Sequence, residues 1–147
     1  MNDLSDIAIT VINSDIQDQQ ELPEITENVR ALLSEIYAML TAFIKDSKTD
    51  IIDLHSLPLL AGEHDAIKTI LGRGEVKLSL DSLGTSTIYE TGLSGVWWIS
   101  HNNENGDCIA ETIEITTIPK ILESQPADIE IAQQALKEQL EDWTEHT

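Results

Sequence analysis

The sequence predicts an α+β domain: a two-layer sandwich in which an antiparallel β-meander of about four to five strands packs against two main helices. Three observations indicate this class. A long helical pattern of apolar residues occupies residues 23–45. Short alternating segments separated by turn residues then fill residues 76–118, and a second long helical pattern follows at residues 126–143. Strands joined by short turns pair antiparallel, so helices are expected before and after a meander.

Length and composition indicate a single domain that follows a flexible arm. A chain of 147 residues with 41% hydrophobic and 24% charged residues is ordinary for one globular domain. We place the arm at residues 1–22, which end in a polar run, and the domain at residues 23–147. No apolar run is long enough to cross a bilayer, and the acidic N-terminus does not resemble a signal peptide. These features predict a soluble, cytoplasmic protein.

The first helix opens at Pro23, a residue that is tolerated in a first helical turn. A short strand is expected at residues 51–54, and a second, shorter helix at residues 63–71 with Gly72 as its C-terminal cap. The apolar residues of the first helix recur at helical spacing and are expected to pack on the sheet: Ile25, Val29, Leu32, Leu33, Ile36, Leu40, Phe43 and Ile44.

The segment Gly72-Arg73-Gly74 invites comparison with a phosphate-binding loop. Such a loop follows a strand and opens a helix, because the phosphate sits at the helix N-terminus. Here the order is reversed, since the segment follows a helix and opens a strand. We therefore interpret it as a helix stop followed by a tight turn.

Four alternating segments form the predicted meander, at residues 76–80, 87–91, 96–101 and 108–118. The loop before the last segment contains Asn105-Gly106, a pair that supplies the positive φ angles of a tight hairpin. Alternation in the last segment places Glu111 on the same face as three isoleucines: Ile109, Ile113 and Ile115.

Trp97 and Trp98 are adjacent in a predicted strand and must therefore point to opposite faces of the sheet. One of them belongs to the core if helices bury one face. The other needs a different cover, which is a loop, a second subunit or a partner, and we expect it at a subunit or partner surface. The pair predicts that a function based on the sheet surface involves this place.

The charge of the chain restricts its partners. Eight Lys and Arg residues against 27 Asp and Glu residues give a formal net charge of -19. Such a surface repels phosphate backbones, which argues against nucleic-acid binding, and it attracts basic peptides. Solubility alone is the simpler interpretation of the same charge.

No catalytic or metal-binding constellation is recognised, so the sequence predicts no enzyme, no metal and no cofactor. Cys108 is single, which excludes an internal disulfide. The histidines are scattered and none pairs with a second ligand at metal spacing: His55, His64, His101 and His146. One alternative is a small enzyme or ligand-binding domain that combines His101 with a glutamate cluster on the meander: Glu75, Glu90, Glu111 and Glu114.

Several landmarks occur in a distinctive order: Ile52-Asp-Leu54, Leu57-Pro-Leu59, Leu71-Gly-Arg-Gly-Glu-Val76, Glu90-Thr91, Gly95-Val-Trp-Trp98, Ile113-Glu-Ile115 and Ile118-Pro119. This order resembles the HupH/HyaF family of hydrogenase expression proteins, over roughly residues 22–140. The resemblance implies a chaperone or assembly factor for uptake [NiFe] hydrogenases. Its implied partner is the precursor of the iron–sulfur small subunit, held in the cytoplasm before twin-arginine export, or another maturation factor.

Many members of that family are considerably longer, so this chain corresponds to their conserved domain, and dimerisation could replace the missing region. We expect the partner to contact one face of the meander and its turns. The candidate contact residues are Arg73, Glu75, Glu90, Trp97, Trp98 and His101.

Overall fold

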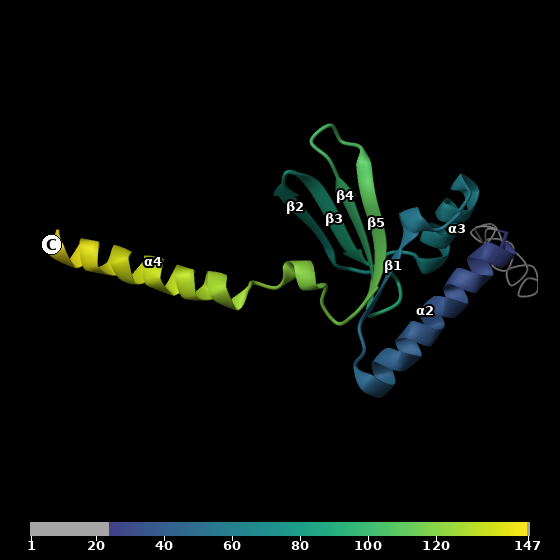
Figure 1. Ribbon diagram of the computed structural model, residues 1–147, viewed down its shortest axis with the longest axis horizontal. Helices are drawn as coiled ribbons and strands as arrows, with labels where there is room; N and C mark the ends of the chain where they lie inside the picture. The colour runs from purple at the N-terminus through teal and green to yellow at the C-terminus, as the bar shows by residue number, and fades with distance from the viewer. Residues whose placement is uncertain (1–23, 147) are drawn as a thin grey trace, which may run out of the picture.

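A computed structural model describes residues 24–146, and the arm expected at residues 1–22 lies outside the described residues. The described residues form one five-stranded antiparallel sheet with the strand order β1-β5-β4-β3-β2 (Figure 1). Its strands are β1 (Asp50–Asp53), β2 (Lys77–Ser82), β3 (Gly84–Glu90), β4 (Val96–Asn102) and β5 (Cys108–Ile115). The expected α+β class and the meander from β2 to β5 are confirmed.

Three α-helices and two short 3-10 helices complete the described chain: α2 (Glu27–Asp46), η1 (Leu54–Ser56), α3 (Ala61–Leu71), η2 (Lys120–Leu122) and α4 (Pro126–Glu145). Helix α2 begins after Thr26, whose hydroxyl accepts a hydrogen bond from the amide of Val29 at 3.3 Å. Helix α3 ends at Leu71, and Gly72 caps it with a φ of 66°, as the sequence predicts.

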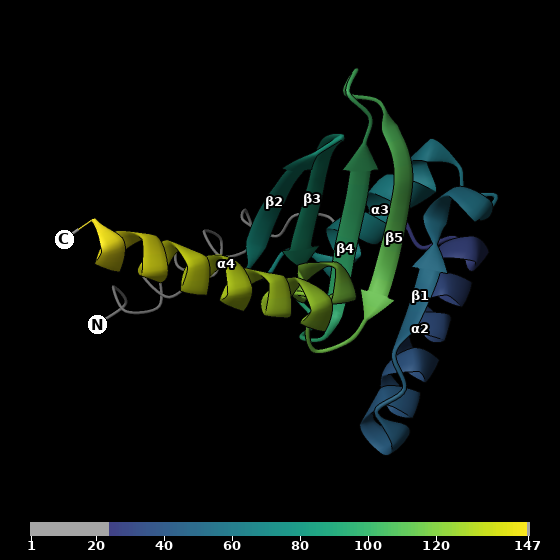
Figure 2. The ribbon, with the colours of Figure 1, turned by 60° about the vertical axis from the view of Figure 1, so that its left-hand side comes forward.

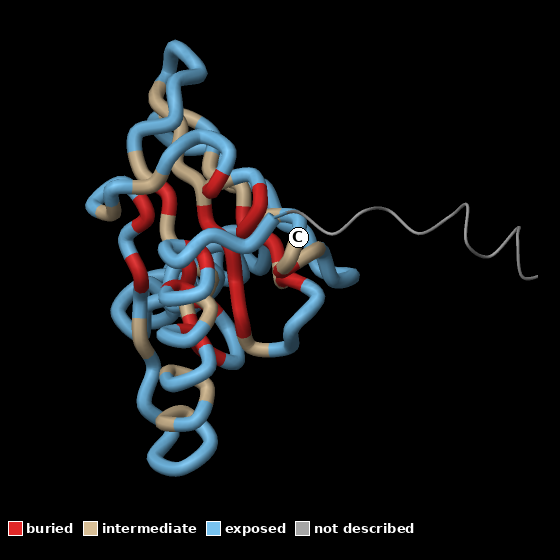
Figure 3. Tube along the Cα trace, turned by 90° about the vertical axis from the view of Figure 1, so that its right-hand side faces the viewer, coloured by how far each residue is buried: buried red, intermediate tan, exposed pale blue. Residues whose placement is uncertain are grey.

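Helices α2 and α3 cover one face of the sheet and enclose the main core (Figures 1 and 2). Both precede the meander, so the second long helix that the sequence predicts, at residues 126–143, is not one of the two helices that pack on the sheet. Buried segments concentrate in the central strands and on the inner side of these helices (Figure 3). The core side chains are Val29, Leu32, Ile36, Ile52, Leu54, Ala66, Ile67, Leu71, Tyr89, Val96, Trp98, Ile113 and Ile115.

The opposite face of the sheet carries a smaller apolar cluster of Ile88, Trp97 and Ile99, against which Leu122 of η2 packs. Trp97 is only 5% exposed, and Trp98 on the other face is fully buried. The two indoles point to opposite faces, as predicted. The expectation that one of them lies at a subunit or partner surface is wrong for the described chain, because a loop of the same chain covers Trp97.

Several element boundaries differ from the sequence prediction. The first helix begins at Glu27 instead of Pro23, because Thr26 caps it, and α3 begins at Ala61 instead of residue 63. Two strand boundaries differ for local reasons. Strand β5 ends at Ile115 instead of residue 118, because the chain turns away there: the hydroxyl of Thr116 donates to the carbonyl of Ile118 at 3.2 Å. Strand β3 begins earlier than expected, since the turn at Gly84 is tight and Gly84 adopts a φ of 119°.

Helix α4 leads away from the sheet on the side opposite to α2 and α3 (Figure 1). Its length agrees with the prediction for residues 126–143, but none of its residues is buried. No helix within residues 24–146 is both long and apolar enough to span a membrane.

Candidate functional site

Glu111 is the centre of a polar network inside the main core. It projects from β5 towards α3 on the face that also carries Ile113, and only 5% of it is exposed. Its carboxylate accepts hydrogen bonds from the indole Nε1 of Trp98 at 2.9 Å and from the hydroxyl of Ser100 at 3.1 Å. Both donors belong to the neighbouring strand β4, so the sheet register brings them to the carboxylate.

Helix α3 supplies two further partners of this carboxylate. His64 and Lys68 are four residues apart and therefore share one face of the helix. The ring Nε2 of His64 is hydrogen-bonded to one carboxylate oxygen, and the Lys68 ammonium lies 3.7 Å from the other. The same ammonium lies 5.2 Å from the ring centroid of Trp98, and the His64 ring meets that indole edge-on. The network thus joins α3 to the sheet.

Burial alone would raise the pKa of the Glu111 carboxyl, because a charged carboxylate is poorly solvated there. The hydrogen bonds from His64 and Trp98, with electrostatic attraction to His64 and Lys68, outweigh burial and lower the pKa of the Glu111 carboxyl. Glu111 is therefore held as a carboxylate. An ionised group with this many donors stabilises a structure rather than serving as a free proton acceptor.

A cleft of about 570 Å³ opens beside this network, between η1 and the start of α3. It is lined by Leu54, His55, Leu57, Leu59, Ala61, His64, Asp65 and Glu111. Cys108 stands near it, with its sulfur 4.0 Å from the Nε2 of His55. Among residues 24–146, no group of three or more His, Cys, Asp or Glu side chains has an arrangement that could hold a metal ion.

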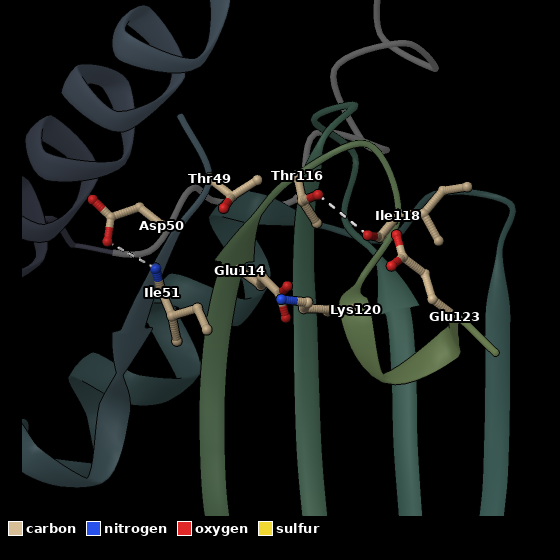
Figure 4. Close-up of a pocket in the computed structure, with 8 residues that line it drawn as sticks. All are labelled: Thr49, Asp50, Ile51, Glu114, Thr116, Ile118, Lys120 and Glu123. Atoms are coloured by element: carbon tan, nitrogen blue, oxygen red, sulfur yellow. Dashed lines mark hydrogen bonds between the residues drawn. The ribbon is translucent and has the colours of Figure 1, made fainter. Parts of the chain in front are cut away.

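A second groove, of about 560 Å³, lies at the end of the sheet where β1, β5 and the segment leading into η2 meet (Figure 4). Two of its lining residues are exposed isoleucines, Ile51 at 58% and Ile118 at 55%. The charged residues around it are mostly acidic: Asp50, Glu114, Glu123 and Lys120. A groove that combines two apolar side chains with an acidic border suits a segment that combines an apolar side chain with positive charges.

Trp97 supports one wall of this groove, which we call the acidic groove. Its Nε1 donates to the backbone carbonyl of Thr116 at 3.1 Å, and Thr116 lines the groove. On the same face, Glu90 and Glu114 flank Trp97 across the two neighbouring strands. The buried indole therefore holds the wall of the groove in place, and it does not itself reach the surface.

The other candidate residues are divided between the two sides of the sheet. Arg73 and Glu75 are exposed in the turn after α3, and the Arg73 guanidinium lies 5.1 Å from the ring centroid of Tyr89. His101 lies on the far face, where its Nδ1 is hydrogen-bonded to the hydroxyl of Ser86 at 2.7 Å. The structure therefore brings Glu90 and Trp97 together on one face of the sheet, whereas Trp98 lies on the other face.

The glutamate cluster around His101, on which the alternative of a small enzyme or ligand-binding domain depends, does not form. Glu111 lies on the face that packs against α3, whereas Glu90 and Glu114 lie on the opposite face with His101. Glu75 stands outside the strands. Sequence reasoning missed the network around Glu111, although one signal was present: a glutamate on the otherwise apolar face of a strand needs buried partners.

Comparison with known proteins gives one consistent family. The region described as "HupH hydrogenase expression protein, C-terminal conserved region" matches residues 26–143. The solved structure of the hydrogenase expression protein HupH from Thiobacillus denitrificans is similar, with a TM-score of 0.75 and 36% identity over 80% of this chain and 98% of that one.

Two curated relatives show the same similarity in sequence. The hydrogenase expression/formation protein HupH of Rhodobacter capsulatus is 28% identical over 126 residues, which is 84% of this chain and 46% of that protein. The hydrogenase expression/formation protein HupQ of Azotobacter chroococcum is 29% identical over 63% of this chain and 32% of its own length. The chain thus spans less than half the length of these curated relatives.

Proposed function

Because this chain belongs to the HupH family of hydrogenase expression proteins, we propose that it is an accessory protein in the maturation of an uptake [NiFe] hydrogenase. In this proposal it binds the precursor of the iron–sulfur small subunit in the cytoplasm before export, and it acts by binding rather than by catalysis. The observation that carries the proposal is the family match over residues 26–143, which includes every strand and the whole of both packed helices.

We place the contact at the acidic groove bordered by Asp50, Glu114 and Glu123. Exposed Ile51 and Ile118 offer apolar contacts in a chain whose net charge is -19, so a basic segment of the precursor is attracted and then held by apolar packing. In the same proposal, the exposed Arg73 and Glu75 contact regions of the precursor outside the groove. Glu90 and His101 add to the same face of the sheet.

Binding of the purified precursor to this protein, measured by calorimetry or by surface kinetics, tests the proposal. Replacing both groove residues, Ile51→Asn with Ile118→Asn, should weaken binding about tenfold, which corresponds to roughly 1.4 kcal/mol. Ile109→Asn is the matched control, because Ile109 is an isoleucine of β5 that is 59% exposed but does not line the groove.

A second pair of variants tests the charge. Glu123→Lys at the groove should weaken binding, whereas Glu104→Lys in the β4–β5 loop should change it little. If the folded wild-type protein does not bind the precursor, the precursor is not its partner. If the groove variants and the control variants all bind as the wild type does, the precursor remains the partner, but the groove is not the contact site.

A further inference from the structure

Helix α4 is a 20-residue helix, and among the described residues none of its side chains is buried. Ile129, Leu136, Leu140 and Trp143 are each more than half exposed. Figure 1 shows the helix leading away from the sheet. In proteins, most of the stability of a helix comes from packing of its apolar face against other segments and not from its intrinsic propensity.

Five of the exposed apolar residues of α4 form a single stripe, which we call the α4 stripe: Ile129, Ala132, Leu136, Leu140 and Trp143. At 3.6 residues per turn these five positions fall within a sector of about 80° around the helix axis. The six acidic residues of the helix all lie outside this sector. Ile131 also lies outside it, on the opposite side of the helix. The stripe is therefore narrow, continuous along the helix and suited to packing against another helix.

The charges of α4 are unfavourable for a helix that stands alone. Six acidic residues face a single cation, Lys137, which is paired with Glu141 at 4.0 Å. The acids Glu141, Asp142 and Glu145 gather at the C-terminal end, and the last turn contains no basic residue. The helix dipole places partial negative charge at that end, so these carboxylates raise the free energy of the free helix.

We propose that α4 is a docking helix for a basic amphipathic helix of a partner protein. An apolar face on the partner covers the α4 stripe, and its lysines and arginines neutralise the acids beside the stripe. Both features that disfavour the isolated helix, the exposed stripe and the C-terminal acids, are relieved by the same partner. The proposal concerns a surface separate from the acidic groove and holds whichever protein supplies the partner helix.

The charges also argue against a second copy of this chain as the occupant. Two α4 helices packed stripe to stripe would bring together two segments that each carry a net charge of -5, from six acids and one lysine. Like charges at such flanking positions disfavour pairing. An anionic membrane surface is disfavoured for the same reason.

Binding of three synthetic peptides to the full chain tests this docking. The first is a 20-residue helical peptide with a leucine stripe flanked by lysines, the second has the same stripe flanked by glutamates, and the third is a scrambled version of the first with the same charge. The lysine-flanked peptide should bind at least tenfold more tightly than the other two. Equal binding of the scrambled peptide would overturn the proposal, because attraction to the net charge would then suffice.

Variants of the helix locate the site. Leu136→Asn with Leu140→Asn should weaken binding of the lysine-flanked peptide at least tenfold, whereas Ile131→Asn should change it less than twofold. Ile131 is a matched control, since it is equally apolar, is 66% exposed and lies on the other side of the same helix. None of these residues is buried, so the variants should unfold at the same urea concentration as the wild type. Equal weakening by Ile131→Asn would overturn the proposal.

Two further results would show that the α4 stripe binds something other than a basic helix. Sedimentation of the protein alone as a dimer that the double variant dissociates would show that a second copy covers the stripe. Binding to phosphatidylglycerol or phosphatidylcholine vesicles that the double variant abolishes would show that α4 is a membrane-binding helix. Either result overturns docking to a basic helix. The proposal is supported if the protein is a monomer, binds neither kind of vesicle and binds the lysine-flanked peptide.

Discussion

The indole Nε1 of Trp98 donates a 2.9 Å hydrogen bond to the carboxylate of Glu111 inside the main core. This bond links β4 to β5, and the same carboxylate is bound by His64 and Lys68 of α3. A buried carboxylate that lacked these donors would be costly. The pair therefore makes the position of α3 on the sheet depend on a polar contact as well as on apolar packing.

Replacing Glu111 with Gln should destabilise the fold by about 1–3 kcal/mol at pH 7, because charge-assisted bonds to His64 and Lys68 are lost. The pKa of Glu111 is lowered in the folded protein. Its contribution to stability is therefore present above the unfolded-state pKa, about 4.3 for a glutamate, and is lost as the pH falls through the folded-state pKa.

Urea unfolding at several pH values checks this prediction. The difference between the wild type and Glu111→Gln should be largest near neutral pH and should shrink as the pH falls below about 4. Glu104→Gln, an exposed residue of the β4–β5 loop, serves as the control and should show little difference at any pH. A difference that stayed constant down to acidic pH would mean that the lost stability comes from packing and not from the charge.

Both tryptophans of β4 should be structural. Trp97→Ala and Trp98→Ala should each cost roughly 3–5 kcal/mol, since both side chains are buried. Trp97→Phe keeps most of the packing but loses the bond to the carbonyl of Thr116, and Trp98→Phe loses the bond to Glu111. Chemical denaturation of the four variants measures these costs. A negligible effect of Trp97→Ala would show that the segment around η2 does not depend on the indole.

The turn after α3 requires glycine at position 74. A Cβ there would lie 2.7 Å from the backbone carbonyl oxygen of Thr91, so Gly74→Ala should lower stability by about 1–3 kcal/mol. Gly62→Ala is the control, because a Cβ at that helical position meets nothing within 4 Å, and it should stabilise by about 0.5–1 kcal/mol. Melting temperatures of the two variants test the prediction.

The same turn is interpreted as a helix stop and not as a phosphate site. Neither inorganic phosphate nor a nucleotide should therefore raise the melting temperature of the wild type. Stabilisation that saturates with nucleotide concentration would restore the phosphate-loop interpretation of Gly72-Arg73-Gly74.

Association with the proposed precursor should slow as ionic strength rises, because long-range attraction to a chain of net charge -19 steers the encounter. At 0.15 M salt the screening length is about 8 Å, so border charges then contribute little. Dissociation should change only slightly, since it depends on apolar packing at Ile51 and Ile118. Stopped-flow rates at several salt concentrations measure both steps. If the association rate does not change with salt concentration, the net charge of the chain contributes to solubility alone.

The meander and its turns were predictable because they depend on local sequence. Alternation assigns Ile88 and Tyr89 to opposite faces, and the structure confirms that division. The cap at Gly72 and the hairpin at Gly106, which has a φ of 86°, follow from the conformational freedom of glycine. The pairing of β1 with β5 could not be read in the same way, because these strands are far apart in sequence and several edges were open to β1.

The sequence determined which side chains are apolar, and the spacing of these residues determined on which face of a strand or helix they lie. The face depends only on the backbone geometry of the element. The tertiary structure alone decided what covers each face. It placed His64 and Lys68 on Glu111, packed Leu122 against the cluster that contains Trp97, and left Leu136 and Leu140 of α4 about half exposed. Those outcomes depend on contacts between distant segments, whose free energies are small differences that no local pattern records.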